Sequence, residues 1–426
     1  MLRVHIFRVH SRVAKQLATI CTVVAACSAL VLFLCASTAG AQSPGPKAYV
    51  GLFGDNAMAV VDTASNQVLS TIPVPDGPHG VVITPDNKRV YVSSDGASTV
   101  SVIDTTSDRV ISSIEVGQTP HGLAITPDGS RVLVAGFGTD MVSAIDTNTN
   151  KITWRVAVPN PHNFAISPDG QTAYVASQKA GSPSLAILSL PGQKQVGSVP
   201  LPNTPRALNF SPDATQMWFT EAGVDEVQVL DPTTNKVITT IPVGVSPHHP
   251  LFTPDGQLGL VVSQGPGELW LLDPATDTST ATVKVGDMPH WIATTPDGQT
   301  AYVTNESSND VSVVDLTTAT VIDTIPVGNA PRKIVVQSAA PQASTNAVNI
   351  VQFAFNPATI TVAHGQSITW TNSDPVQHTT TSDSPGWDSG PLSTNATFTT
   401  TFNTPGTFAY HCSIHPFIHG TVVVTS

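Results

Sequence analysis

Between residues 48 and 337 the chain alternates short apolar runs with turn-forming residues, and this pattern returns about every 42 residues. One unit contains the runs HGLAITPDG, SRVLVAGF, DMVSAIDT and KITWRVAV. Turn residues separate each pair of runs, which is typical of short β-strands joined by turns. The pattern therefore predicts four short strands in each unit.

Repeating units of four strands and 40–45 residues are typical of the blades of a β-propeller. The inner strand of each unit begins with Pro-His or Pro-Arg and occurs seven times, at His79, His121, His162, Arg206, His248, His290 and Arg332. The other three strands begin earlier, at Tyr49, so the run from Arg332 must pair with the strand at Tyr49 to complete the last blade. We therefore expect a closed seven-bladed β-propeller over residues 48–337.

These repeats resemble the YVTN family of propeller proteins, and Tyr302-Val303-Thr304-Asn305 spells the motif of that family. The resemblance covers the repeated region only. It implies the fold but no particular chemistry, because propellers host many functions.

The period ends near Gln337, where a small, polar segment at residues 338–347 reads as a flexible linker. In residues 348–426, hydrophobic and polar positions alternate in short runs such as TITVAHG, SITWTN, ATFTTTF and GTVVVTS. The pattern predicts a small β-sandwich. The expected fold class is therefore all-β, with a seven-bladed propeller followed by a sandwich.

The first 41 residues have the pattern of an export signal. Four basic residues precede an apolar run from Leu17 to Ala36, and Ala39-Gly40-Ala41 supplies a cleavage site. The apolar run is also long enough to span a bilayer, so an uncleaved anchor is the alternative. We expect an exported bacterial protein, in the periplasm, outside the cell or at its surface, which contacts a membrane only if the anchor is retained.

Composition restricts the partners. Charged residues make up only 11% of the chain, the formal net charge is −12, and every acidic residue lies after the signal. An acidic protein argues against nucleic acid as a ligand and favours a basic protein partner. Three of the four cysteines lie in the signal, which leaves Cys412 without a disulfide partner.

The ending YHCSIHPFIHGTVVV explains why a lone cysteine is present. Cys412 ends a predicted strand, and His415 follows on a short loop, so both side chains can reach one metal ion. His378, after another strand, is the candidate for a third ligand. Two histidines and one cysteine form the trigonal site of blue-copper proteins. Zinc with a water ligand and a Cys-His nucleophile pair are the alternatives for the same residues.

This domain resembles the cupredoxins of the plastocyanin, pseudoazurin and amicyanin type, through FAFNPATITVAHGQSITWTNSDPVQH, DSGPLS, FNTPGTFAYHCSIHP and GTVVV in that order. The resemblance implies one type 1 copper ion held by His378, Cys412 and His415. It also implies that Asn372 steadies the copper loop by hydrogen bonding. The family's weak axial methionine is replaced by Ile418, which has no donor atom, and the copper should then be three-coordinate with a raised reduction potential.

The propeller offers a second candidate site. Equivalent residues in repeats around an axis form a ring, so the seven inner-strand residues should gather at one mouth of the central channel. Such a ring could bind a metal ion or an anion, with the two arginines favouring an anion. The alternative is that the histidines merely repeat a packing residue of the duplicated unit.

We therefore expect an electron-transfer protein rather than a catalyst, with the propeller as a docking or presentation scaffold. Electrons would pass through an exposed His415, flanked by Pro416 and Phe417, to a redox partner protein. Two alternatives remain. One is a propeller that binds a surface or ligand and carries a secondary copper domain. The other is an oxidoreductase with a second metal at the histidine ring.

Overall fold

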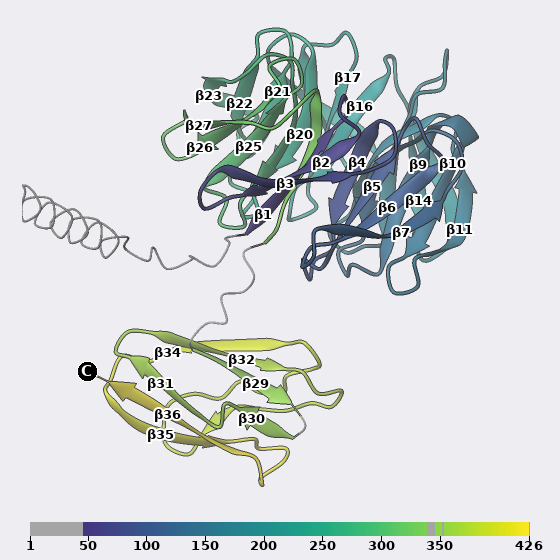
Figure 1. Ribbon diagram of the computed structural model, residues 1–426. Coiled ribbons are helices and arrows are strands. Elements are labelled where there is room, and N and C mark those ends of the chain that lie inside the picture. The colour runs from purple at the N-terminus through teal and green to yellow at the C-terminus, as the bar shows by residue number, and fades with distance from the viewer. Residues whose placement is uncertain (1–45, 339–345, 352, 426) are drawn as a thin grey trace, which may run out of the picture. The chain divides into compact units, whose positions relative to one another are not determined.

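The computed structural model describes residues 46–338, 346–351 and 353–425 (Figure 1). These residues form two β-structures, one up to residue 338 and one from residue 346, and each is treated by itself. The predicted export signal lies outside the described residues, as does most of the predicted linker. Within the described part of the chain, no helix is long and apolar enough to cross a membrane.

The first structure contains seven four-stranded sheets. In six of them four consecutive strands pair in chain order, and in the seventh the last strand of the region pairs with the first. The strands, sheet by sheet, are β28 (Pro331–Val336), β1 (Lys47–Leu52), β2 (Ala57–Asp62) and β3 (Gln67–Pro73); β4 (Pro78–Ile83), β5 (Arg89–Ser94), β6 (Thr99–Asp104) and β7 (Arg109–Glu115); β8 (Pro120–Ile125), β9 (Arg131–Gly136), β10 (Met141–Asp146) and β11 (Lys151–Ala157); β12 (Pro161–Ile166), β13 (Thr172–Ser177), β14 (Ser184–Ser189) and β15 (Lys194–Pro200); β16 (Pro205–Phe210), β17 (Met217–Glu221), β18 (Glu226–Asp231) and β19 (Lys236–Pro242); β20 (Pro247–Phe252), β21 (Gly259–Ser263), β22 (Glu268–Asp273) and β23 (Thr278–Lys284); β24 (Pro289–Thr294), β25 (Thr300–Asn305), β26 (Asp310–Asp315) and β27 (Thr320–Pro326). A short 3₁₀ turn, η1 (Phe137–Thr139), follows β9.

The sheets close into a ring, as the sequence predicted. The inner strands contact each other in the cyclic order β4, β8, β12, β16, β20, β24, β28 and again β4. Closure depends on the antiparallel pairing of β1 with β28, in which Tyr49 faces Val335. The pairing brings the two ends of the propeller into one sheet and removes an edge that could otherwise pair with another chain.

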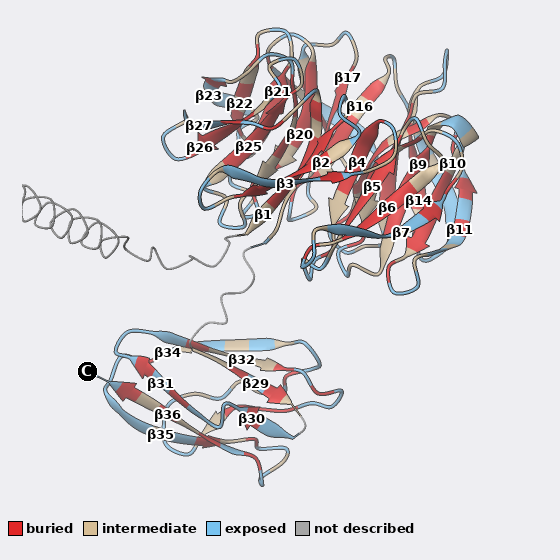
Figure 2. Ribbon diagram, in the orientation of Figure 1, coloured by how far each residue is buried: buried red, intermediate tan, exposed pale blue. Residues whose placement is uncertain are grey.

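Burial follows the position of each strand within its sheet (Figure 2). The second and third strands are buried almost throughout, as in β1 and β2, whereas the fourth strand, as in β3, buries one position in seven. The near-continuous apolar runs in the middle strands are therefore buried on both faces by neighbouring sheets. The fourth strands form the outer rim.

The repeated Thr-Pro-Asp motif makes a hydrogen-bonded turn. Thr84 Oγ1 donates to Asp86 Oδ1 (2.6 Å), and the backbone N–H of Lys88 donates to the same oxygen (3.0 Å). The later copies repeat this contact, for example between Thr253 and Asp255 (2.7 Å). The motif is a turn signal with a side-chain mechanism, which explains why it marked the repeat so clearly.

The tyrosine of the Tyr-Val pair joins neighbouring sheets. Tyr49 Oη donates to Asp108 Oδ1, and Tyr91 Oη donates to Asn150 Oδ1; both distances are 2.7 Å. Both acceptors lie in the turn before the outer strand of the next sheet. These buried phenols therefore link consecutive blades as well as packing within their own.

The second structure is a sandwich of two four-stranded sheets. One has the order β30-β29-β32-β34 and the other the order β31-β36-β35-β33. The strands are β29 (Ala347–Val351), β30 (Ala354–Asn356), β31 (Thr359–Ala363), β32 (Ser367–Asn372), β33 (Thr381–Ser382), β34 (Thr397–Thr401), β35 (Gly406–His411) and β36 (His419–Thr425). Their inward side chains form one core, centred on the fully buried Trp370 and Tyr410.

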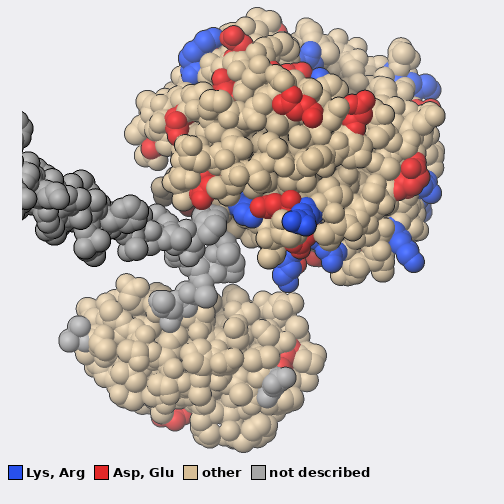
Figure 3. Space-filling model, viewed as in Figure 1, with Lys and Arg blue, Asp and Glu red and all other residues tan. Residues whose placement is uncertain are grey.

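The sandwich is almost uncharged. It has no lysine or arginine, and its acids are Asp374, Asp383 and Asp388. On the face drawn in Figure 3, all the Lys and Arg side chains belong to the propeller. The acidic character of the chain therefore resides mainly in the propeller, and the sandwich carries few charges.

Candidate metal centre

Two loops at one end of the sandwich carry the predicted metal ligands. Cys412 directly follows β35, and His415 lies on the tight loop between β35 and β36. Backbone hydrogen bonds fasten this loop, from Cys412 N to Ile418 O (3.1 Å) and from Ile418 N to His415 O (3.0 Å). His378 lies after β32 and pairs with Leu392 through two backbone hydrogen bonds. The ends of three strands thus fix the loops independently of any ion.

The structure brings His378, Cys412 and His415 together. Cys412 Sγ lies 3.6 Å from His378 Nδ1 and 3.8 Å from His415 Nδ1, and the two nitrogens are 3.2 Å apart. A trigonal ion at ordinary metal–nitrogen and metal–sulfur distances would hold its donors about 3.6–3.8 Å apart. The three atoms therefore surround one point with nearly the separations that such an ion requires. His378 and Cys412 are fully buried.

Contacts behind the donor atoms orient them. Nε2–H of His378 donates to Asp374 Oδ2 (3.1 Å), which leaves the Nδ1 lone pair directed at Cys412. The backbone N–H of Thr379 points at Cys412 Sγ (3.2 Å), where it would stabilise a thiolate. Burial, followed by the nearby His415, lowers the pKa of His378, while Asp374 opposes the shift. The surroundings thus favour a neutral imidazole at His378, which is the form that binds metal.

Asn372 joins the two loops around His378. Its Nδ2 group donates to Val376 O and to Leu392 O, each over 2.8 Å, and its Oδ1 atom accepts from Asp374 N (3.0 Å). Asn372 is fully buried, so these bonds are shielded from water. The residue therefore touches none of the three donor atoms and acts on His378 through the backbone.

The region around the donors is apolar. Ile418 is 2% exposed and packs in the same core cluster as Cys412. His419, beside it, is exposed. Phe353 lies edge-on to both ligand imidazoles, with ring centroids 5.4 Å from His378 and 5.1 Å from His415. His415 is partly buried, which corrects the expectation of an exposed imidazole.

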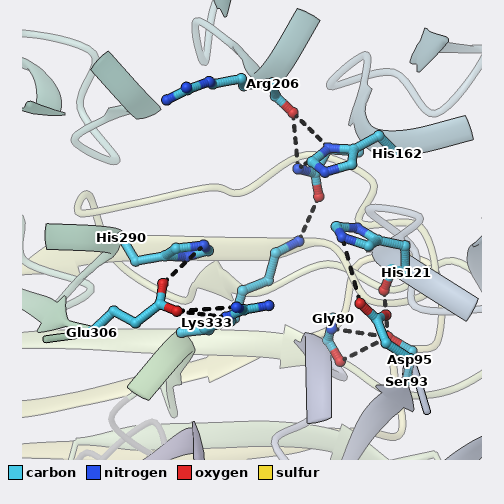
Figure 4. Close-up of polar contacts among 11 residues, drawn as sticks. Gly80, Ser93, Asp95, His121, His162, Arg206, His290, Glu306 and Lys333 are labelled. Carbon is cyan, nitrogen blue, oxygen red and sulfur yellow. Dashed lines mark hydrogen bonds and ion pairs between the residues drawn. The ribbon is translucent and has the colours of Figure 1, made fainter. Parts of the chain in front are cut away.

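The inner-strand histidines of the propeller also gather. Ring centroids are 3.7 Å apart for His79 and His121, 4.0 Å for His121 and His162, and 4.2 Å for His248 and His290. Figure 4 shows His121, His162 and His290 around the side chain of Lys333, a residue that the sequence analysis did not single out. We call the five histidines His79, His121, His162, His248 and His290 the histidine ring.

Two acids lie beside this ring. Asp95 Oδ2 is 3.7 Å from His121 Nε2, and Glu306 Oε2 is 3.9 Å from His290 Nε2. His79, Asp95 and His121 each offer a donor atom within 4.8 Å of the other two, as do His378, Cys412 and His415 in the sandwich. Asp95 and Glu306 follow the second strands β5 and β25, at the same end of the propeller as the inner-strand histidines.

The two ring arginines have their own partners. Arg332 bonds Glu306 Oε1 (3.0 Å) and lies 3.5 Å above the Phe53 ring. Arg206 donates to Ser246 Oγ (2.9 Å). Both are therefore held at the side of the ring, which weakens the interpretation of the pair as an anion clamp.

Burial controls the charge inside the ring. It lowers the pKa of His162 to about 4 and that of His248 to about 3, and holds those of His79, His121 and His290 well below the usual value. It also lowers the pKa of Lys333 to about 7. At neutral pH the ring therefore consists of neutral imidazoles.

Known proteins match the two structures separately. Residues 332–424 match the cupredoxin-like domain family, and residues 48–131 match the YNCE-like β-propeller family. Residues 96–190 also match the family of the outer membrane protein assembly factor BamB. The β-propeller and the cupredoxin domain predicted from the sequence are thus confirmed.

Amicyanin-alpha from Methylorubrum extorquens is 39% identical over 90 residues, which cover 20% of this chain and 75% of amicyanin. Among solved structures, hydrazine synthase from Kuenenia stuttgartiensis aligns with a TM-score of 0.59 and 21% identity, over 66% of this chain and 98% of that one. A functionally unknown protein from Desulfotomaculum acetoxidans aligns with a TM-score of 0.59 and 14% identity, over 69% and 99%. At these identities the structures support the propeller fold alone.

Proposed function

Because the chain belongs to the cupredoxin family through its C-terminal domain, we propose that it transfers single electrons through one type 1 copper ion held by His378, Cys412 and His415. The observation that carries the proposal is the arrangement of two Nδ1 atoms and one Sγ atom around a common point, at 3.2–3.8 Å from each other. Bound copper supplies reversible one-electron exchange. The residues of the chain hold the donor atoms in place and provide the surface for a partner.

The rigid loops are the first contribution of the chain. His378 is held by Asp374 and by the backbone pairing with Leu392, while Cys412 and His415 are held by the hydrogen-bonded loop that Ile418 closes. Donor atoms that cannot move preserve the same geometry before and after the electron arrives. A site of this kind needs little reorganisation, which is the requirement for rapid electron transfer.

Neutral and apolar surface is the second contribution. Around the half-exposed His415 lie the exposed side chains of Ile414 and Phe417, which are 44% and 69% exposed, and Phe353 at 43%. Large exposed apolar side chains grouped in one place are typical of interaction sites. We infer that a redox partner docks here, in the brief, small contact that electron carriers use.

The propeller and the cell compartment complete the proposal. An acidic propeller suits a basic partner, and we propose that it presents the copper domain to that partner or binds the partner itself. We also propose export to the periplasm or the cell surface, which rests on the basic and apolar pattern of residues 1–41.

Voltammetry of the copper-loaded chain tests electron transfer. We expect one reversible one-electron wave for the wild type and none for Cys412→Ser, which removes the thiolate ligand. Ser413→Ala, next to it in the same loop, is the matched control and should retain the wave. A wild type that accepts no electron, or a Cys412→Ser variant with an unchanged wave, would contradict the proposal.

A further inference from the structure

The histidine ring contains polar atoms that nothing in the described structure satisfies. Nδ1 of His79, His121, His248 and His290 is buried without a hydrogen-bond partner, and so is Oδ1 of Asp95. Buried polar groups are almost always paired, because an unpaired one loses its bonds to water without replacement. An unsatisfied set gathered at one place therefore indicates a ligand.

The charges select a cation rather than an anion. Imidazoles that stay neutral when buried present lone pairs, and an anion would need them protonated. The other positive groups are already engaged, since Lys333 Nζ donates to Asn163 Oδ1 (2.7 Å) and lies 4.0 Å above the Trp291 ring. Asp95, in contrast, is an acid with 19% side-chain exposure whose pKa is raised by burial to about 7, and the neutral imidazole of His121 lies 3.7 Å from it, so a bound cation would favour its carboxylate form.

We propose that His79, Asp95 and His121 form a second metal site, in the propeller, that binds a divalent transition-metal ion of the kind that prefers imidazole, such as Zn²⁺ or Cu²⁺. One donor atom of each residue lies within 4.8 Å of one from each of the others. The contact between His121 and Asp95 joins Nε2 and Oδ2, 3.7 Å apart, and not the unsatisfied Nδ1 and Oδ1 atoms of the same side chains. Donors of a tetrahedral ion lie about 3.4 Å apart, so small side-chain rotations bring all three into contact with one ion. Two nitrogens and one carboxylate oxygen are a common ligand set for zinc.

The neighbouring histidine in the ring shows what a satisfied position looks like. Nδ1–H of His162 donates to Arg206 O (3.0 Å), and Asn163 Nδ2 donates to the same carbonyl (2.9 Å). His162 therefore belongs to the repeat by position but already has its partner. The difference between His79 and His162 provides a control within one ring.

Zinc titration of the copper-loaded full chain tests the proposal, because copper then occupies the cysteine site. We expect one further Zn²⁺ per chain, bound at micromolar concentration or tighter. Asp95→Asn and His79→Gln should weaken binding at least about tenfold, whereas His162→Gln should change it less than about threefold. No binding beyond the copper, or an equal loss in all three variants, would overturn the proposal.

X-ray absorption at the zinc edge gives a reading on the unmodified protein, so it does not depend on how the variants fold. We expect a shell of nitrogen and oxygen with the scattering of two imidazoles. A sulfur neighbour at about 2.3 Å would mean that zinc had displaced copper from Cys412, and it would overturn the second site. Loss of the electron carrier in the sandwich would leave this result unchanged, so the two proposals fail separately.

Discussion

The site of His378, Cys412 and His415 in the sandwich and the histidine ring of the propeller both gather imidazoles. The two sites differ in the contact made by the second nitrogen of each imidazole. In the sandwich, His378 commits Nε2 to Asp374, and Nδ1 faces Cys412. In the propeller, four imidazoles have a buried Nδ1 atom without a partner. In the first arrangement, two specialised loops bring three donor atoms around a common point. The second results from repetition, and acids lie beside only two of its histidines, Asp95 beside His121 and Glu306 beside His290.

The comparison teaches that the number of histidines does not define a metal site. In the sandwich a backing contact from Asp374 sets the tautomer of His378 and aims its lone pair, whereas the site proposed in the propeller depends on the acid Asp95 beside two imidazoles. Single substitutions at the buried lysine, the backing carboxylate, the axial position and one contact between blades test this comparison, from the largest expected effect to the smallest.

Lys333→Met tests the buried charge inside the ring. Burial lowers the pKa of Lys333 to about 7, whereas an unfolded lysine keeps a pKa near 10.5. Between these values the unfolded chain binds more protons, so the stability of the wild type rises with pH from 7 to 10.5 and is lowest below 7. We expect the variant to be more stable below pH 7 by roughly 1–3 kcal/mol, after allowing for the lost bond to Asn163.

Calorimetry of the propeller transition at several pH values measures this effect. The advantage of Lys333→Met should shrink as the pH rises towards 10. Lys88→Met, on an exposed turn, is the control and should show no such trend. An advantage for Lys333→Met that grows with pH would contradict the assignment of a buried, easily deprotonated lysine.

Asp374→Asn tests the hydrogen bond between Asp374 and the ligand His378. The change removes the carboxylate that accepts from His378 Nε2, so the imidazole loses its fixed tautomer and orientation. We expect copper affinity to fall about 10- to 100-fold. Competition with a chelator measures it, with the exposed Asp388→Asn as the control. An equal loss of copper affinity in both variants would mean that affinity depends on the overall negative charge of the domain and not on the contact with His378.

Ile418→Met tests the axial position. Ile418 is 2% exposed and packs beside Cys412, so a thioether introduced there lies near the donor atoms. An added weak ligand should stabilise the oxidised ion and lower the reduction potential by tens of millivolts. Ile414→Met, at a side chain that is 44% exposed, should leave the potential unchanged. A potential that stays constant in Ile418→Met would show that the axial direction lies elsewhere.

Tyr91→Phe should have the smallest effect. It removes the phenol that donates to Asn150 in the next blade, over 2.7 Å, and should lower the stability of the propeller by about 1 kcal/mol. A double-mutant cycle with Asn150→Ala isolates the contact. The copper spectrum should not change, and a change would reveal a coupling between the two structures.

Much of the fold followed from the sequence, because each blade repeats the same turn and strand signals. The Thr84 turn is a local feature that recurs in the other blades, and the pairing of β1 with β28 followed from counting the inner strands against the other three. The ligands His378, Cys412 and His415 could be predicted for a similar reason, because they lie at or after strand ends that the sequence pattern marks. Copies of a pattern make a prediction robust.

The backing residues were harder to foresee. Asp95 and Glu306 approach the ring from the turns after β5 and β25, and Lys333 follows the ring position on the inner strand β28. The other blades do not repeat these residues at the same places. Phe353 covers His415 from a turn before β30 that is distant in sequence. Asp374 could have been found, because it lies four residues before His378 on the same loop. Contacts that depend on tertiary packing leave no periodic signal.

The most direct test of the account is the visible absorption of the copper-loaded chain beside that of Cys412→Ser. The thiolate ligand predicts an intense band near about 600 nm for the wild type and its complete loss in the variant. A colourless wild type with copper bound, or a band that survives the replacement of sulfur by oxygen, would contradict the claim that His378, Cys412 and His415 hold the ion together.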